Sequence, residues 1–234
     1  MKFAVIDNTA RGMTCTSGRG KGYANVLRDW GFGQDYEFVR YNTVARRREE
    51  LRSCSGLILS GSERDFANRT DCLNTDVYEE TSPEFELIRD FSGPVLGVCF
   101  GHQLLSLAEE FEPSRSDFGA IRIRNMRKPE IGYCVDQLRF DSPIGFSQQT
   151  ELWVQNNHRQ EVVPGDVLRR HFDVIAHSEQ CAVQVIRHRS RKWFGVQFHP
   201  EVGMPSENGE TSRHEDAVAA GYGLIGDFVR YCLG

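Results

Sequence analysis

Two short apolar runs constrain the fold more than any other feature of the sequence. They read GLILSGS at residues 56–62 and GPVLGVCF at residues 93–100, and apolar side chains follow one another in both with little alternation. Such near-continuous runs are typical of strands in parallel sheets that are covered on both faces. Another run, FAVID at residues 3–7, opens the chain, and helix-like segments separate the three. The first half therefore predicts an α/β fold with a mostly parallel, doubly wound sheet and flanking helices.

The second half is richer in strand signals and predicts a smaller antiparallel β portion. Turn residues separate six expected strands, at 120–126, 131–138, 151–157, 173–178, 181–188 and 193–199. The segment 214–233 has helical periodicity. We expect five of its residues to face the core: Val218, Tyr222, Ile225, Val229 and Cys232. Because 234 residues suit one large α/β domain and no linker or repeat interrupts them, we expect a single domain over residues 1–234.

Composition excludes several classes of function. The net charge of -5 argues against a protein built to bind nucleic acid or an anionic membrane. No apolar run approaches the roughly 20 residues of a membrane span, and the N-terminus does not resemble a secretory signal. The seven cysteines include no CxxC pair, which predicts neither a disulfide framework nor a zinc site. We therefore expect a cytoplasmic protein with mostly inert thiols.

A glycine-rich segment at residues 8–22 is the only candidate for a phosphate-binding loop. It departs from the G-x-x-x-x-G-K-[ST] pattern, because Gly22 follows Lys21 where Ser or Thr is needed. We interpret it as a flexible loop. No metal or nucleotide cofactor is expected.

Cys99 lies in a G-x-C-x-G motif between an apolar run and a helix-like segment. In the serine version of this motif, small neighbours allow a sharp strand-to-helix turn that carries a nucleophile. Such a turn presents the sulfur at the carboxyl end of a strand, where open α/β sheets bind their ligands. The adjacent helix N-terminus favours negative charge, and its N–H groups can stabilise an oxyanion. These features favour a nucleophilic role for Cys99.

A thiol nucleophile needs a base, and the base can lie far away in the sequence. His102 lies on the first turn after the motif, where reaching back to Cys99 is geometrically awkward. His199, in GVQFHPE, follows an apolar run and precedes Pro200 and Glu201. A carboxylate two residues on can orient the imidazole and stabilise its charged form. The expected chain order of a triad is therefore Cys99, His199, Glu201.

The pair GVCFGHQ and GVQFHPE resembles the signature motifs of class I, triad-type glutamine amidotransferases. This resemblance implies a glutaminase that hydrolyses L-glutamine to glutamate and ammonia through a γ-glutamyl thioester. Carried over, Cys99 is the nucleophile, His199 the general base and acid, and Glu201 the orienting carboxylate. The oxyanion hole then uses the backbone N–H groups of Gly61 and Phe100. A donor that approaches the substrate closely favours glycine at position 61, although a simple strand-end turn also accounts for that glycine.

The resemblance also implies the residues that contact substrate. Gln103 is expected to hold the amino-acid end of glutamine, and Ser60 belongs to the same pocket. The segment 156–164 is expected to be a loop that borders the pocket. It carries His158, for which a substrate contact and a structural role both remain open.

Residues 60–65 read SGSERD, where many family members carry Ser-Gly-Gly-Pro. This form is similar to stand-alone members that resemble the amidotransferase domains of GMP synthases, and to γ-glutamyl peptidases. The leading hypothesis is a glutaminase that passes ammonia to a separate synthetase partner. The alternative is an autonomous γ-glutamyl peptidase or hydrolase, which uses the same triad with a larger leaving group. A third hypothesis is a non-catalytic regulatory protein that keeps the fold.

Overall fold

A central seven-stranded sheet organises the chain. The computed structural model describes residues 2–9, 22–29, 36–203 and 211–234, so most of the glycine-rich segment lies outside the described residues. The strand order is β2-β1-β3-β4-β9-β8-β7. The strands are β1 (Phe3–Asp7), β2 (Tyr36–Arg40), β3 (Leu57–Leu59), β4 (Val95–Val98), β7 (Phe172–Ala176), β8 (Val185–His188) and β9 (Trp193–Val196).

The direction of the strands confirms the mostly parallel sheet. Strands β2, β1, β3, β4 and β9 pair in parallel, whereas β8 runs antiparallel to both β9 and β7. All residues of β1, β3, β4 and β9 are buried, as the apolar runs predict for strands covered on both faces. The carboxyl ends of β3, β4 and β9 therefore meet at one edge of the sheet.

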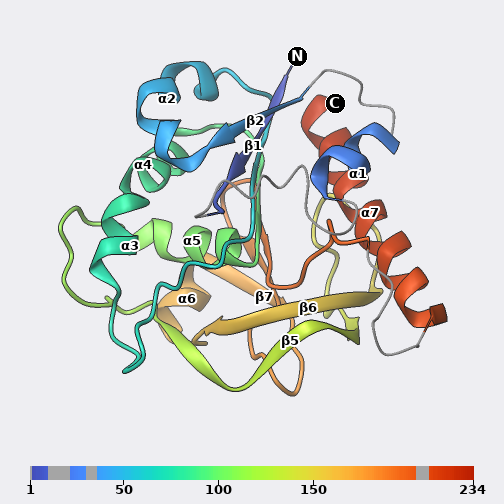
Figure 1. The fold of residues 1–234 in the computed structure, drawn as a ribbon. Helices are drawn as coiled ribbons and strands as arrows, with labels where there is room; N and C mark the ends of the chain where they lie inside the picture. The colour runs from blue at the N-terminus through green and yellow to red at the C-terminus, as the bar shows by residue number, and fades with distance from the viewer. Residues whose placement is uncertain (1, 10–21, 30–35, 204–210) are drawn as a thin grey trace.

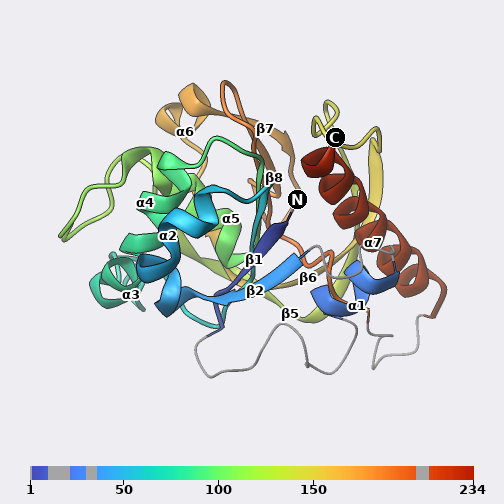
Figure 2. The same ribbon diagram turned by 90° about the horizontal axis from the view of Figure 1, so that it is seen from above.

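Helices cover both faces of the sheet (Figures 1 and 2). On one face lie α2 to α4, and on the other lie α1 and the long C-terminal α7. The helices are α1 (Tyr23–Asp29), α2 (Val44–Arg52), α3 (Thr75–Glu80), α4 (Ser82–Asp90), α5 (Phe100–Leu107), α6 (Asp166–His171) and α7 (Thr211–Leu233), with 3-10 turns at Tyr41–Thr43 and Ala108–Glu110. Two apolar clusters result, one on each face. On α7, Tyr222, Ile225 and Val229 are buried in the second cluster, and Val218 and Cys232 pack against it.

A two-stranded antiparallel ribbon accounts for the smaller β portion. It joins β5 (Ile123–Arg139) to β6 (Glu151–Val162) and lies beside the main sheet (Figure 1). The prediction of two separate strands at 120–126 and 131–138 was wrong, because β5 is continuous. Two register shifts, on either side of Glu130, absorb the residues that looked like a break. Gly132 has φ +86°, a conformation that suits glycine within such an irregular stretch.

The predicted loop at 156–164 was also wrong over most of its length. Residues 156–162 belong to β6 and pair with β5. Within the part of the chain that the structure describes, no helix is both long and apolar enough to cross a membrane.

Candidate active site

Cys99 occupies the turn between β4 and α5, as the motif predicts. Its backbone has φ 51° and ψ -105°, a region that residues other than glycine rarely adopt. Its N–H donates to the carbonyl of Val196 in β9 (2.8 Å), and its carbonyl accepts the N–H of Gln103 in α5 (3.1 Å). The surrounding sheet and helix therefore hold a strained residue in place, which is typical of a nucleophile turn.

The glycines on either side of Cys99 are required by close backbone contacts. A Cβ added to Gly97 would lie 2.4 Å from the carbonyl oxygen of Gly101, and one added to Gly101 would lie 2.2 Å from that of Leu59. Helix α5 thus approaches β3 and β4 more closely than any side chain permits. The turn is sharp because both positions lack a Cβ.

His199 and Glu201 lie on the segment that follows β9. The Nδ1 atom of His199 is 2.9 Å from Oε1 of Glu201, and both side chains are largely buried, at 11% and 12% exposed. The N–H of His199 donates to the carbonyl of Gln155 in β6 (2.8 Å). Because Glu201 engages Nδ1, Nε2 is the ring nitrogen that remains for the thiol of Cys99.

The electrostatic surroundings of His199 favour the imidazolium. Burial alone would lower its pKa, but the charge of Glu201 and then the Cys99 thiol outweigh burial, and the pKa lies well above its ordinary value. The influence of Cys99 on this pKa reflects how close the two side chains lie. Thiol, imidazole and carboxylate therefore form one interacting group in the predicted order.

Replacing Glu201 with Gln is expected to destabilise the protein in a pH-dependent way. The ion pair raises the pKa of His199 above its unfolded value of about 6.5, so the stabilisation is complete below about pH 6.5 and is lost as pH rises through the folded-state pKa. We expect Glu201→Gln to lower the free energy of unfolding by on the order of 1–2 kcal/mol near pH 6. Urea unfolding from pH 6 to pH 10 measures the difference from wild type, which should shrink toward the alkaline end. A difference that stays constant over this range would contradict the ion pair.

Gly61 lies against both reactive side chains. A Cβ at this position would lie 2.9 Å from Cε1 of His199 and 3.5 Å from Cβ of Cys99. Its neighbour Ser60 is buried, accepts the backbone N–H of Asn8 (2.9 Å) and donates its hydroxyl hydrogen to the carbonyl of Gly61 (3.0 Å). Phe100 is the first residue of α5, directly after Cys99. The two residues expected to form the oxyanion hole therefore adjoin Cys99 from two different elements.

The side chain of Gln103 lies inside a buried polar network. Its Nε2 donates to the carbonyl of Gln160 (3.1 Å) and to Oε1 of Gln197 (3.3 Å), and the residue is 3% exposed. A role in holding glutamine stays a prediction. It would require the amide group to exchange one of these contacts for the substrate.

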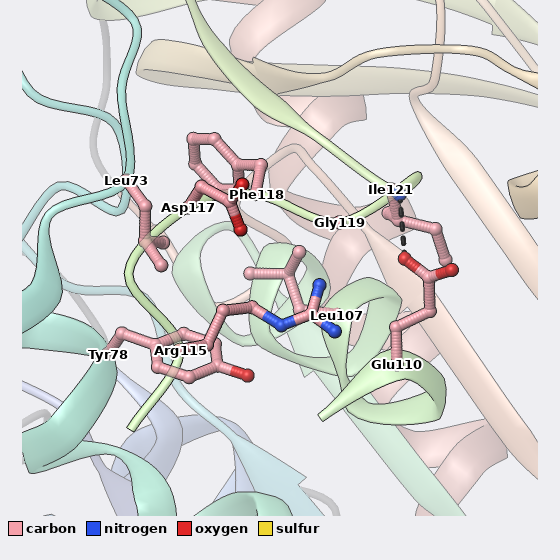
Figure 3. A pocket seen from close by; sticks show the side chains of 9 residues that line it. All are labelled: Leu73, Tyr78, Leu107, Glu110, Arg115, Asp117, Phe118, Gly119 and Ile121. Atoms are coloured by element: carbon pink, nitrogen blue, oxygen red, sulfur yellow. Dashed lines mark hydrogen bonds between the residues drawn. The ribbon is translucent and has the colours of Figure 1, made fainter. Parts of the chain in front are cut away.

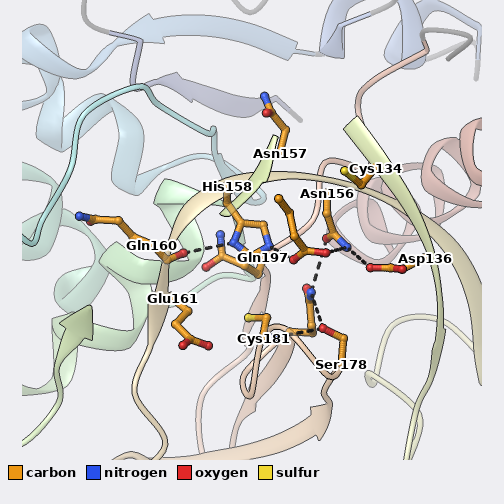
Figure 4. Close-up of polar contacts among 12 residues, drawn as sticks. Cys134, Asp136, Asn156, Asn157, His158, Gln160, Glu161, Ser178, Cys181 and Gln197 are labelled. Atoms are coloured by element: carbon orange, nitrogen blue, oxygen red, sulfur yellow. Dashed lines mark hydrogen bonds and ion pairs between the residues drawn. The ribbon is translucent and has the colours of Figure 1, made fainter. Parts of the chain in front are cut away.

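His158 belongs to the same interior region, shown in Figure 4. Its side chain is 1% exposed, with Nε2 3.0 Å from Oε2 of Glu130 and Nδ1 3.2 Å from the carbonyl of Gln160. Asn156 donates to both Glu130 and Asp136 (3.0 Å each), which ties the two strands of the ribbon together. These contacts describe a structural histidine. Its contact with substrate stays a prediction, and would require displacement of Glu130.

His102 is fully buried in α5 and faces the sheet. A Cβ on Gly195 in β9 would lie 2.6 Å from its Nδ1. Burial lowers the pKa of His102 to about 3, so the ring is neutral at physiological pH. It packs between α5 and the sheet, whereas His199 is the histidine beside Gly61 and Cys99.

One group among the described residues has the side chains of a metal site: Glu109, His171 and His188. Nδ1 of His188 accepts the N–H groups of Ser190 (3.1 Å) and Arg191 (3.0 Å), so its proton lies on Nε2 and points at Glu109 (3.0 Å). A metal-bound imidazole needs the opposite arrangement, with its second nitrogen donating. These residues therefore fit a hydrogen-bonded ion cluster better than a metal site.

A small cavity lies away from Cys99 (Figure 3). Its volume of about 10 Å³ corresponds to roughly one water molecule. Within its lining, Glu110 accepts the N–H of Ile121 (2.9 Å). The lining residues are Leu73, Tyr78, Leu107, Glu110, Arg115, Asp117, Phe118, Gly119 and Ile121. The cavity shares no residue with the triad and is too small for an amino acid.

Three residues that support the site carry no recognisable motif in the sequence. The carbonyl of Gln155 anchors the backbone of His199, and the side chain of Asn8 reaches across from the end of β1 to Ser60. Arg64, in the SGSERD segment, donates to Asn8. Each acts through contacts with residues more than 40 positions away, which no local pattern records.

A cysteine on a strand-to-helix turn, facing a histidine–carboxylate pair at the edge of a mostly parallel sheet, defines a class of α/β enzymes with a thiol nucleophile. Within that class, the model of the family described as "Glutamine amidotransferase class-I" matches residues 23–215, well over half of the chain. The chain belongs to the class-I glutamine amidotransferase family, which confirms the family and the fold expected from its motifs.

Relatives in this family are described as the glutamine-hydrolysing subunit of GMP synthase. One, from Methanococcus maripaludis strain C5, is 31% identical over 63% of this chain, and the match spans 64% of the relative's length. Another, from strain S2 of the same species, is 30% identical over 72% of this chain and 75% of the relative.

Solved structures share the fold across the whole chain. A protein from Thermoplasma acidophilum, described as a GMP synthase subunit, has a TM-score of 0.65 at 23% identity, covering 100% of this chain and 98% of that one. A glutamine amidotransferase from Thermotoga maritima has a TM-score of 0.69 at 16% identity, covering 99% and 98%.

Proposed function

We propose that this protein hydrolyses L-glutamine to glutamate and ammonia through a γ-glutamyl thioester on Cys99. The observation that carries the proposal is the placement of Cys99 on a strained turn, with Gly61 against both its Cβ and the His199 ring. Membership of a glutamine amidotransferase family supports the same reaction class. We treat residues 1–234 as one domain in this proposal.

The reaction begins with attack of the Cys99 sulfur on the side-chain carbonyl carbon of glutamine. The thiol proton passes to Nε2 of His199, and the imidazolium is stabilised by Glu201 through Nδ1. The carbonyl oxygen becomes an oxyanion, which accepts hydrogen bonds from the N–H groups of Gly61 and Phe100.

Collapse of this intermediate breaks the carbon–nitrogen bond. His199 returns its proton to the departing nitrogen, ammonia leaves, and Cys99 carries the γ-glutamyl group as a thioester. Water then attacks the thioester with His199 as base, which releases glutamate and restores the thiol. Each proton taken up by His199 is returned, so the triad ends in its starting state.

We further propose that the ammonia passes to a separate synthetase protein in the cytoplasm. Relatives from Methanococcus maripaludis are named as one subunit of a GMP synthase, which supports a partner of this kind. The six cysteines that the structure describes are all free thiols, as a reducing compartment favours.

The test measures glutamate release from L-glutamine and from γ-glutamyl peptides, with a Cys99→Ala variant as blank. We expect hydrolysis of glutamine to exceed that of the peptides, and the rate to rise when the synthetase is added. A clear preference for γ-glutamyl peptides would favour the peptidase, and no turnover of either substrate would favour a regulatory protein. High glutaminase activity that no synthetase changes would contradict the partner.

A further inference from the structure

Arg64 is a buried cation beside the proposed oxyanion hole, and the reaction steps above do not use it. Its side chain is only 7% exposed, although arginine is among the residues least often buried. The guanidinium carbon lies 3.9 Å from the ring centroid of Tyr41 and 4.9 Å from that of Phe100. The ring of Phe100 is stacked in turn on Phe66. Arg64 is therefore fixed in an aromatic setting at the start of α5.

The polar contacts of Arg64 reach both sides of Gly61. On one side, its Nε donates to the hydroxyl of Ser62 (3.3 Å), which also accepts the backbone N–H of Arg64 (3.0 Å). On the other side, its Nη2 donates to Oδ1 of Asn8 (3.2 Å). Asn8 donates its backbone N–H to the hydroxyl of Ser60 (2.9 Å) and its side-chain amide to the carbonyl of Ser60 (3.4 Å). Gly61 is thus held between two residues that Arg64 secures.

We infer that Arg64 is a positioning residue that fixes the backbone N–H groups of Gly61 and Phe100 relative to each other. The two donors come from separate elements, the end of β3 and the start of α5. Arg64 secures the residues flanking the first donor and stacks on the side chain of the second. The inference rests on the proposed function, because an oxyanion hole has a role only if acyl transfer occurs at Cys99.

Arginine suits this task better than lysine. The planar guanidinium can stack on a ring while its edge donates to Ser62 and Asn8 in fixed directions. An ammonium supplies the charge without that plane. A change that keeps the charge but removes the plane therefore separates positioning from simple neutralisation.

Neutralisation is the competing role, because two carboxylates lie near Arg64. Glu80 is 3.4 Å from Nη1 and half exposed. Glu84 is fully buried in α4, where burial raises its pKa to about 7 while Arg64 and Asn8 act in the opposite direction. If Arg64 serves only as their countercharge, its effect on turnover should follow charge rather than shape.

The experiment compares two rates in Arg64→Met and Arg64→Lys. The first is the steady-state kcat and KM for L-glutamine hydrolysis, which passes through an oxyanion. The second is alkylation of Cys99 by iodoacetamide, a displacement at a tetrahedral carbon that forms no oxyanion. We expect kcat to fall on the order of 100-fold in Arg64→Met and about 10-fold in Arg64→Lys, with KM within about threefold. The alkylation rate should stay within about twofold of wild type in both, because the nucleophile turn is intact.

Arg48→Met is the matched control, since Arg48 is an arginine on α2 that pairs with Glu86 and Asp90 away from Cys99, and its kcat should not change. Unchanged kcat in both Arg64 variants would overturn the inference, as would equal losses in turnover and alkylation. Full activity in Arg64→Lys alone would assign Arg64 to charge neutralisation and also overturn it. Should Arg64→Met not fold, the lysine variant decides. Absence of glutamine turnover in the wild type would instead contradict the proposed function, and the inference with it.

Discussion

Cys99→Ala is expected to lower glutamine hydrolysis by a factor on the order of 10⁵, because no other group can form the thioester. The fold should persist, since the side chain that is removed is small and the backbone contacts of residue 99 remain. Glutamate release measures the loss. Mass spectrometry of the wild type quenched during turnover should show the γ-glutamyl adduct on the peptide that contains residue 99, and the variant should lack it.

Cys72→Ala serves as the control for this experiment. Cys72 is an exposed free thiol in the segment before α3, remote in sequence from both signature motifs. Its replacement should leave both the rate and the adduct unchanged. An adduct on any cysteine other than Cys99, or full activity in Cys99→Ala, would contradict the assignment of the nucleophile.

Gly101→Ala is expected to destabilise the protein by about 3 kcal/mol. The new methyl group would lie 2.2 Å from the backbone oxygen of Leu59, and backbone cannot rotate away as a side chain can. Relief requires α5 to move off β3, which also shifts Cys99 and Gly61 apart and should reduce activity. Urea unfolding measures the change in free energy.

Gly223→Ala in α7 is the matched control, with the opposite sign expected. An added Cβ there meets only Nε2 of Gln149 at 3.3 Å, the far end of a flexible side chain. Alanine favours a helix by about 0.5–1 kcal/mol over glycine, so this variant should be more stable than wild type. Since helix propensity alone predicts stabilisation at both positions, a stabilised Gly101→Ala would contradict the close packing at the nucleophile turn.

Local patterns in the sequence predicted the sheet and the nucleophile turn because both depend on short-range features. An apolar run such as residues 93–98 indicates a buried strand whichever strands lie beside it, and Gly97 and Gly101 indicate a sharp turn. The order of Cys99, His199 and Glu201 followed from the same kind of local evidence. Their mutual geometry in the structure agrees with that order.

Features that depend on pairing between distant residues could not be predicted. The bulges in β5 are visible only when its register with β6 is known, so one strand looked like two. The burial of His158 likewise depends on Glu130 across the ribbon, and the surroundings of Arg64 depend on Asn8 and Tyr41. No local pattern distinguishes these buried polar residues from exposed ones.

The backbone bonds of the nucleophile and the base connect them to different parts of the molecule. Cys99 is bonded to β9 inside the main sheet, whereas the N–H of His199 is bonded to Gln155 in the ribbon. A tilt of the ribbon relative to the sheet would therefore change the distance from sulfur to imidazole without breaking either bond. Catalytic competence in such a molecule depends on the relative orientation of two rigid bodies, and a protein that contacts the ribbon could control turnover without entering the substrate pocket.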